Sequence, residues 1–162
     1  MKENDLLISN RSGCYTVTVS GRANFEYAVP LRDLARSTAD FSAFRFDMKN
    51  CTAMDSTFMG VLTMLALKAK KCNVVIDICN ANDTLKKLLR DLGVAKLFNF
   101  SEFENSEAGV SGKEACDMLT AAETVEEAHR TLAEMNSENA EKFKDVIEFT
   151  RQDVERLKQN KQ

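Results

Sequence analysis

The sequence predicts an α/β fold in which helices cover a small β-sheet, followed by a C-terminal helical extension. Within the first hundred residues, short apolar segments with strand alternation are interleaved with segments of helical period. The 162 residues, 44% of them apolar and 29% charged, are enough for one buried core plus an appendage. Beyond about residue 111 the apolar pattern is helical only.

The chain is predicted to begin with a β-hairpin and a helix. Residues 6–9 form a short apolar strand, and residues 14–20 alternate apolar and polar side chains, as in a strand packed on one face. Gly21 is expected to end the second strand. Helical spacing then extends over residues 25–37, and Pro30 requires the helix to begin near it, because proline lacks a backbone N–H.

The next elements continue the alternation. Phe44, Phe46 and Met48 alternate with charged residues and predict a third strand, which an amphipathic helix follows. The β-branched run at residues 72–79 predicts a strand buried on both faces. A helix over residues 83–92, stopped by Gly93, and a short strand at residues 97–100 complete the unit.

Three regions are therefore predicted: a compact domain over residues 1–103, a linker over 104–110 and a helical tail over 111–162. Two capping-box patterns, Ser111 with Glu114 and Thr124 with Glu127, predict two helix starts in the tail. After a break at Asn136, a longer amphipathic helix follows. Either the tail packs back on the domain, or its apolar face binds a partner or a second copy of the chain.

Composition excludes several function classes. A net charge of -3, from 22 basic and 25 acidic residues, gives no basic field for nucleic acid or anionic lipid. No apolar run approaches the roughly 20 residues of a membrane span, and no secretory leader is recognised, so we expect a cytoplasmic protein. Five cysteines without a Cys-x-x-Cys pair and one histidine predict reduced thiols and no metal site. No cofactor motif occurs.

Asp55-Ser56-Thr57 stands between the third strand and the helix that follows it. One interpretation is a helix cap, because Asp, Ser and Thr accept hydrogen bonds from the free N–H groups of the first turn. The other is a hydroxyl displayed for phosphorylation, because those N–H groups and the helix dipole favour an added phosphate. Composition and spacing leave both interpretations open.

The motif and its setting resemble the STAS domain of anti-sigma factor antagonists. Asp55-Ser56-Thr57 is followed by Gly60, the order of strands and helices is similar, and residues 80–100 resemble that family's third helix and last strand. The resemblance covers about residues 5–103. It departs from the family pattern at Phe58 and Met59, where Gly-Leu is common, and at Asn24, where an aspartate is expected.

The resemblance implies a small mixed sheet covered by helices and a non-catalytic, phosphorylation-switched binding module that regulates transcription. It implies Ser56 as the phosphate acceptor and Thr57 as second choice. Its implied partners are a serine kinase that doubles as an anti-sigma factor, and a PP2C-type phosphatase. The implied partner surface consists of Asn24, Asp55, Phe58, Met59 and Gly60.

The alternative function is a STAS scaffold without a switch, in which the helical tail makes the main contact with a partner complex. An enzyme would need a base beside Ser56. The only histidine, His129, lies in the tail and is expected to be an exposed helix residue. No catalytic residue is therefore predicted.

Overall fold

The structure, a computed structural model, describes residues 4–38, 40–104, 109–112 and 116–160. Within these residues, six strands form one mixed sheet in the order β5-β4-β3-β2-β1-β6. Strands β2, β3, β4 and β5 run parallel to one another, whereas β1 is antiparallel to both β2 and β6. The strands are β1 (Asp5–Arg11), β2 (Cys14–Ala23), β3 (Ala43–Met54), β4 (Ile76–Cys79), β5 (Phe98–Ser101) and β6 (Val110–Ser111).

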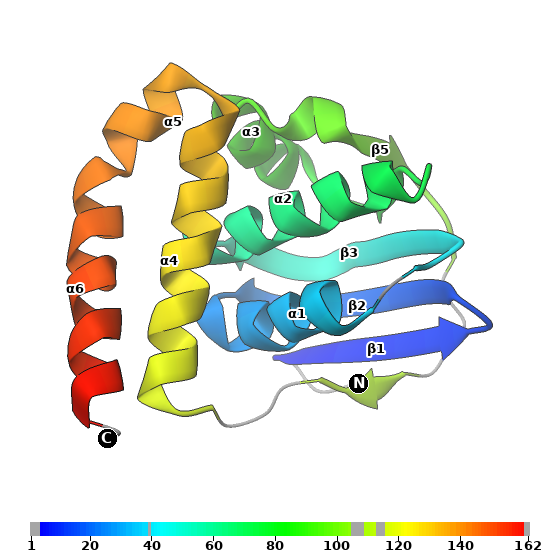
Figure 1. Cartoon of the computed structure of the whole chain (residues 1–162). Helices are drawn as coiled ribbons and strands as arrows, with labels where there is room; N and C mark the ends of the chain where they lie inside the picture. Colours follow the sequence, from blue (N-terminus) through cyan, green and yellow to red (C-terminus); the bar gives the residue numbers. More distant parts are fainter. Residues whose placement is uncertain (1–3, 39, 105–108, 113–115, 161–162) are drawn as a thin grey trace.

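Helices cover one face of this sheet, and the tail packs beside them (Figure 1). Each crossover from β2 to β5 steps in the same direction, and right-handed crossovers then put their helices on one face. Helix α4 crosses α1 and α2, and α6 lies outside α4. The helices are α1 (Phe25–Ser37), α2 (Ser56–Lys71), α3 (Asp83–Asp91), the 3₁₀ turn η1 (Ala95–Leu97), α4 (Met118–Met135), α5 (Ser137–Lys142) and α6 (Lys144–Asn160). The predicted α/β fold with a helical extension is confirmed.

The main core lies between the sheet and its helices. Val17 and Val19 of β2 and Phe46 of β3 are fully buried, as the alternation in their strands predicts. The rings of Phe44 and Phe46 stack with their centroids 5.3 Å apart. These apolar side chains, one from every second residue, hold the strands in register under the helices.

The tail contributes to the same core. Ala128 and Leu132 of α4, together with Phe143, belong to the apolar cluster that includes Phe58 and Leu62 of α2. Packing the apolar stripe of α4 against α2 removes apolar side chains of both helices from water. The interpretation in which the tail packs back on the domain is therefore confirmed.

Three features of the sheet differ from the sequence predictions. Strand β4 covers only Ile76–Cys79 of the predicted residues 72–79, because Cys72 still caps α2 and Val75 is exposed. Strand β2 continues beyond Ser20 to Ala23, because Gly21 adopts a φ of +79° at a shift of register against β3 and so kinks the strand without ending it. The two-residue strand β6 arises within the region assigned to the linker and the start of the tail, and it pairs with Leu7 and Ile8 of β1. Two residues are too few for a period-2 pattern to be recognised.

Helix α1 has the bounds that the helical spacing predicts, but Pro30 does not lie near its start. It starts at Phe25, capped by Asn24, and Pro30 lies inside it. The missing N–H of Pro30 costs one helix hydrogen bond. The buried side chains on either side, Val29 and Leu31, keep the segment helical through tertiary packing.

The two predicted helix starts of the tail are wrong. A single helix, α4, begins at Met118, and Asp117 caps it by accepting a hydrogen bond from Thr120 N–H at 2.7 Å. Thr124 lies within α4, where its hydroxyl donates to the carbonyl of Thr120. A hydroxyl can bond one turn back as easily as it caps a first turn, so its spacing from a glutamate does not fix a helix start.

Of the other pair, Ser111 lies in β6 and Glu114 is outside the described residues. The predicted break at Asn136 is confirmed, since Asn136 caps α5.

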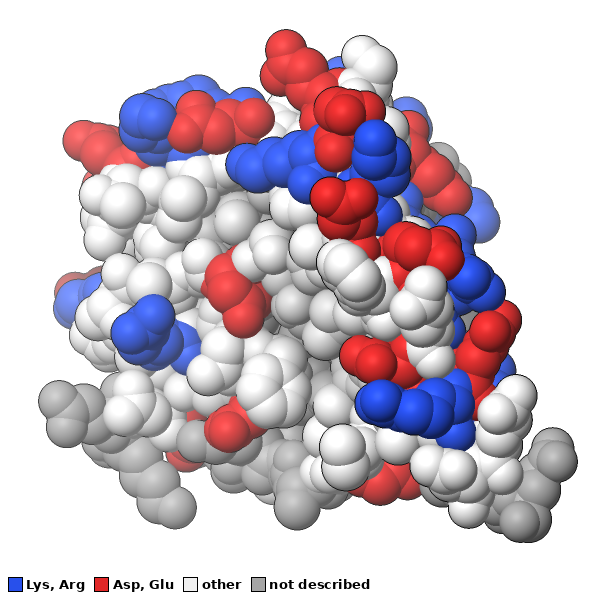
Figure 2. Space-filling model, turned by 90° about the vertical axis from the view of Figure 1, so that its left-hand side faces the viewer, with Lys and Arg blue, Asp and Glu red and all other residues white. Residues whose placement is uncertain are grey.

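The surface on the α6 side of the molecule carries acidic and basic side chains side by side (Figure 2). Several of them form ion pairs within α6, such as Arg151 with Glu148 and Glu155. Such a face offers no field of one sign to a charged polymer. Among the described residues, no helix is both long and apolar enough to cross a membrane.

Candidate functional site at the start of helix α2

The carboxyl ends of β2 and β3 bring the starts of α1 and α2 together. Ala23 pairs with Met54 at the ends of these parallel strands, and Asp55 N–H donates to the Ala23 carbonyl at 3.0 Å. Each strand then enters a helix through a polar cap, Asn24 for α1 and Asp55 for α2. Two helix N-termini therefore open at the same edge of the sheet.

Ser56 is the first residue of α2. The preceding Asp55 has extended backbone geometry, and its carboxylate accepts a hydrogen bond from Phe58 N–H at 2.8 Å. Desolvation at the junction raises the pKa of Asp55, against the opposing effect of that hydrogen bond. The cap interpretation of the motif is thus correct for Asp55, which leaves the Ser56 hydroxyl free for another partner.

That partner is His129 of α4. The Ser56 Oγ lies 2.8 Å from His129 Nε2, and His129 Nδ1 lies 2.7 Å from the Val125 carbonyl oxygen. A carbonyl only accepts, so Nδ1 carries the proton, and in the neutral ring Nε2 accepts from the Ser56 hydroxyl. Burial lowers the pKa of His129, which favours this neutral form. His129 is only 3% exposed, so the prediction of an exposed histidine is wrong.

One turn further along α2, the two helices meet at their backbones. A Cβ atom placed on Gly60 would lie 2.4 Å from the carbonyl oxygen of Ala128 and 2.6 Å from its carbonyl carbon. Only glycine allows so close a crossing. Gly60 is therefore required by the contact with α4, irrespective of any partner.

An ion pair holds the other side of α4 against α1. Glu127 accepts two hydrogen bonds from the Arg32 guanidinium, at 2.9 and 3.1 Å, and Arg36 lies 3.7 Å away. The hydrogen bond from Arg32 lowers the pKa of Glu127, and the same bond raises the pKa of Arg32. Three consecutive residues of α4, Glu127, Ala128 and His129, thus contact Arg32, Gly60 and Ser56 in turn.

The predicted site residues fall into two groups. Asn24, Asp55 and Ser56 lie at the strand ends where the helices begin. The others are buried: Thr57, Phe58, Met59 and Gly60. A partner that touches the ring of Phe58 would need α2 to rearrange, because that ring is in the core. Of the predicted partner surface, α4 covers Gly60, whereas Asp55 is exposed and Asn24 is half-buried.

Sequence reasoning missed the residues that complete the site. Glu127, Ala128 and His129 lie about seventy residues after Ser56 in the chain, and no motif links the two segments. The available signals were the single histidine and the apolar stripe of α4, which show that this helix packs on a surface but not on which surface.

The Ser56–His129 pair has the hydrogen bond of a nucleophile with its base. The pair lies where α4 crosses α2 at backbone contact, and the Phe143 ring stands edge-on to His129 with centroids 5.1 Å apart. In this structure the pair joins α2 to α4.

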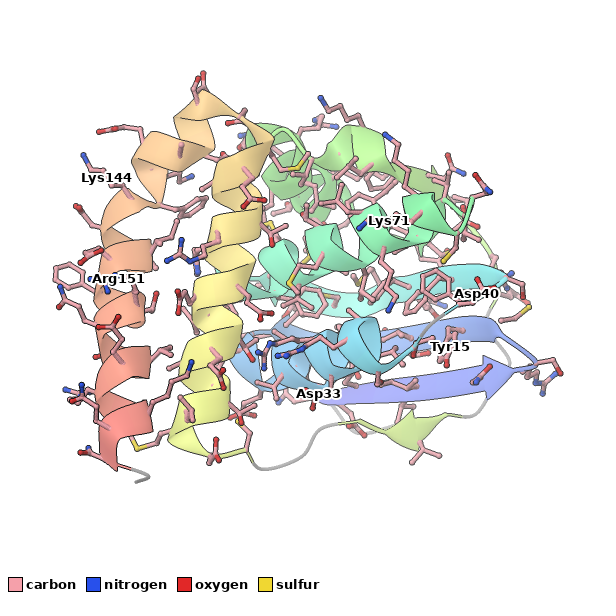
Figure 3. All side chains as sticks on the ribbon, in the orientation of Figure 1. Tyr15, Asp33, Asp40, Lys71, Lys144 and Arg151 are labelled. Atoms are coloured by element: carbon pink, nitrogen blue, oxygen red, sulfur yellow. The ribbon has the colours of Figure 1, made fainter. Side chains whose placement is uncertain are left out.

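An open depression of about 450 Å³ lies at the other end of the sheet, lined by residues that include Asp40, Phe41 and Cys72. Figure 3 shows Tyr15 and Asp40 at that end, and Lys71 at the end of α2 remote from α4. Ser56 is not part of this depression, so the two regions are separate.

Comparison with known proteins assigns the family. The STAS domain model matches residues 6–108, which is well over half of the chain. The chain belongs to the STAS domain family. The match ends before α4, so the tail that covers Ser56 lies outside the family model. A search of curated proteins finds no match.

Solved structures resemble part of this STAS protein. A candidate anti-sigma factor antagonist from Thermotoga maritima aligns with a TM-score of 0.50 and 9% identity, over 60% of this chain and 86% of that one. The anti-sigma factor antagonist SpoIIAA in its unphosphorylated form aligns with a TM-score of 0.47 and 9% identity, over 62% of this chain and 89% of that one. The alignment with the Thermotoga maritima structure supports the fold of the STAS domain.

Docking of the tail is expected to weaken as the pH falls below about 6.5, the ordinary pKa of histidine. The pKa of His129 is lowered in the folded protein, so its contribution to stability is complete above that pH and is lost as the pH falls toward the lowered value. Urea unfolding and amide hydrogen exchange of α4 at several pH values would measure the effect. His129→Gln should remove the dependence in this range. An equally steep dependence in the variant would contradict the assignment to His129.

Proposed function

We propose that this STAS protein is a regulatory binding module of the anti-sigma factor antagonist type, whose partner binding is switched by phosphorylation at Ser56. The observation that carries the proposal is the place of Ser56 in a STAS domain: it is the first residue of α2, directly after the capping Asp55. Asp55 already caps the helix, so the Ser56 hydroxyl is not needed for that purpose.

A phosphate at Ser56 suits an on–off contact. It would add about -1.5 to -2 charges at pH 7 beside the carboxylate of Asp55. A partner that fits the unmodified junction of Asn24, Asp55 and Ser56 would then meet both added bulk and charge repulsion. Thr57 is the second choice as acceptor, and its burial makes it the less accessible hydroxyl.

The proposed partners are a serine kinase that also acts as an anti-sigma factor, and a PP2C-type phosphatase that removes the phosphate. No catalysis by the chain itself and no cofactor are needed for this role, and we propose that it operates in the cytoplasm. The support comes from family membership and from the chemistry of Ser56. The structural neighbours, at 9% identity, do not add support for these partners.

A second candidate function is a scaffold without a switch, in which the tail makes the main contact with a partner or with a second copy of the chain. It is favoured by the outer face of α6, where Val146 and Phe149 are exposed apolar side chains. On this proposal Ser56 serves only to hold α4.

Incubation of the full chain with the serine kinase of its sigma-factor system should add one phosphate at Ser56, detected by Phos-tag electrophoresis and mass spectrometry. Ser56→Ala should abolish the modification, and Thr57→Ala should leave it in place. An unmodified chain, with the kinase active on a control substrate, would refute the switch.

Partner binding separates the two candidates. On the switch proposal, Ser56→Asp weakens binding at least about tenfold and Phe149→Asp leaves it unchanged. On the scaffold proposal the two results are reversed. Isothermal titration against the kinase decides between them, and Val75→Asp, at another exposed apolar residue, is a matched control for Phe149→Asp.

A further inference from the structure

Helix α4 occupies the space that a phosphate on Ser56 would need. The Ser56 Oγ and His129 Nε2 are 2.8 Å apart, the distance of a direct hydrogen bond. A phosphoryl group attached to that oxygen cannot be inserted between the two atoms. Either the serine side chain turns away, or α4 moves.

The crossing of the helices prevents a small adjustment of α4. Gly60 and Ala128 are already in backbone contact one turn from Ser56. The two hydrogen bonds between Arg32 and Glu127 fix the opposite side of the helix. Contacts at three consecutive residues of α4 therefore have to be released together.

The charge of a phosphate on Ser56, like its size, opposes docking of α4. The carboxylate of Asp55 lies at the same helix start, and His129 is held in its neutral form by burial and by its bond to the Val125 carbonyl. A new dianion would meet a neighbouring negative charge and a histidine without a compensating positive charge. Ser56 is partly buried, so water screens this repulsion less than it would at an open surface.

We propose that phosphorylation of Ser56 and docking of α4 on α2 exclude each other, so that the tail is an intramolecular cover which a phosphate at Ser56 opens. This rests on the proposed function, in which Ser56 is the modified residue. Opening uncovers the face of α2 around Gly60 and the apolar stripe of α4, which includes Leu132. Because coupling is reciprocal, the closed tail lowers the affinity of any partner that binds the uncovered face.

The test needs no kinase. Phosphoserine is installed at position 56 of the full chain by genetic code expansion, and amide hydrogen exchange is followed by mass spectrometry. We expect exchange in α4 to rise by about tenfold or more, while β3 and β4 keep their protection. Phosphoserine at Ser37, an exposed residue at the far end of α1, is the matched control and should leave α4 protected.

A positive control opens the tail without touching Ser56. Glu127→Arg places a second cation against Arg32 and should raise exchange in α4, whereas Glu134→Arg on the exposed face of the same helix should not. The proposal is overturned if phosphoserine at position 56 leaves α4 protected, or if β3 and β4 lose protection equally. Failure of a kinase to modify Ser56 would refute the proposed function but would leave this exchange result unaffected.

Discussion

Replacing Gly60 by alanine is expected to destabilise the protein by about 1–3 kcal/mol, the usual cost of forcing an extra methyl group into a packed interface. In a helix without a neighbour the same change stabilises by about 0.8–1 kcal/mol, because alanine is the better helix former. The added Cβ atom would lie 2.4 Å from the Ala128 carbonyl oxygen. The sign of the effect therefore reports whether α4 is docked on α2.

Urea unfolding of Gly60→Ala measures this effect. Ala128→Gly should not rescue the variant, because the nearest obstructing atoms belong to the backbone of residue 128. The cost should shrink when Gly60→Ala is combined with Glu127→Arg, which weakens docking beforehand. A Gly60→Ala protein more stable than the parent would show that the crossing is not populated in solution.

The second large effect is expected for Leu132→Ala, which should cost about 2–5 kcal/mol of docking free energy. Leu132 is fully buried and belongs to the cluster that α4 shares with the domain. Truncating it leaves a cavity between helices that cannot close, because the Gly60–Ala128 contact already sets their separation.

Met118→Ala is the matched control, since Met118 is in the same helix and is 72% exposed. It should change stability by no more than about 0.5 kcal/mol. Denaturant midpoints and hydrogen exchange of α4 measure both variants. Equal, small effects of the two substitutions would mean that the tail is not part of the shared core.

These results would place the regulation of this STAS protein in its own tail. The family match ends before α4, and the three consecutive contacts at Glu127, Ala128 and His129 all come from beyond it. On our proposal, a partner that binds the start of α2 would therefore compete with a helix of the same chain. On the proposed function, the strength of that competition would set how readily the domain is switched.

Much of the fold could be predicted from the sequence because it depends on local periodicity. The alternation around Val17 and Phe46 and the helical spacing of α1, α2 and α3 placed most elements close to their observed bounds. The predictions were wrong where one local sequence pattern is compatible with two local structures. Thr124 looks like a cap but bonds one turn back, and Gly21 looks like a strand end but forms a kink.

The sequence by itself determined that Asp55-Ser56-Thr57 starts a helix after a strand, because capping is decided within one turn of the chain. From the sequence alone, it could not be predicted that His129 lies beside Ser56, that α4 crosses α2 at Gly60, or that Phe58 is buried. Those depend on which surface the apolar stripe of α4 covers. The apolar stripe of an amphipathic helix shows that the helix packs against another surface, but it does not show which surface. Only the tertiary structure, in which α4 packs across α2, decided that the tail covers Ser56.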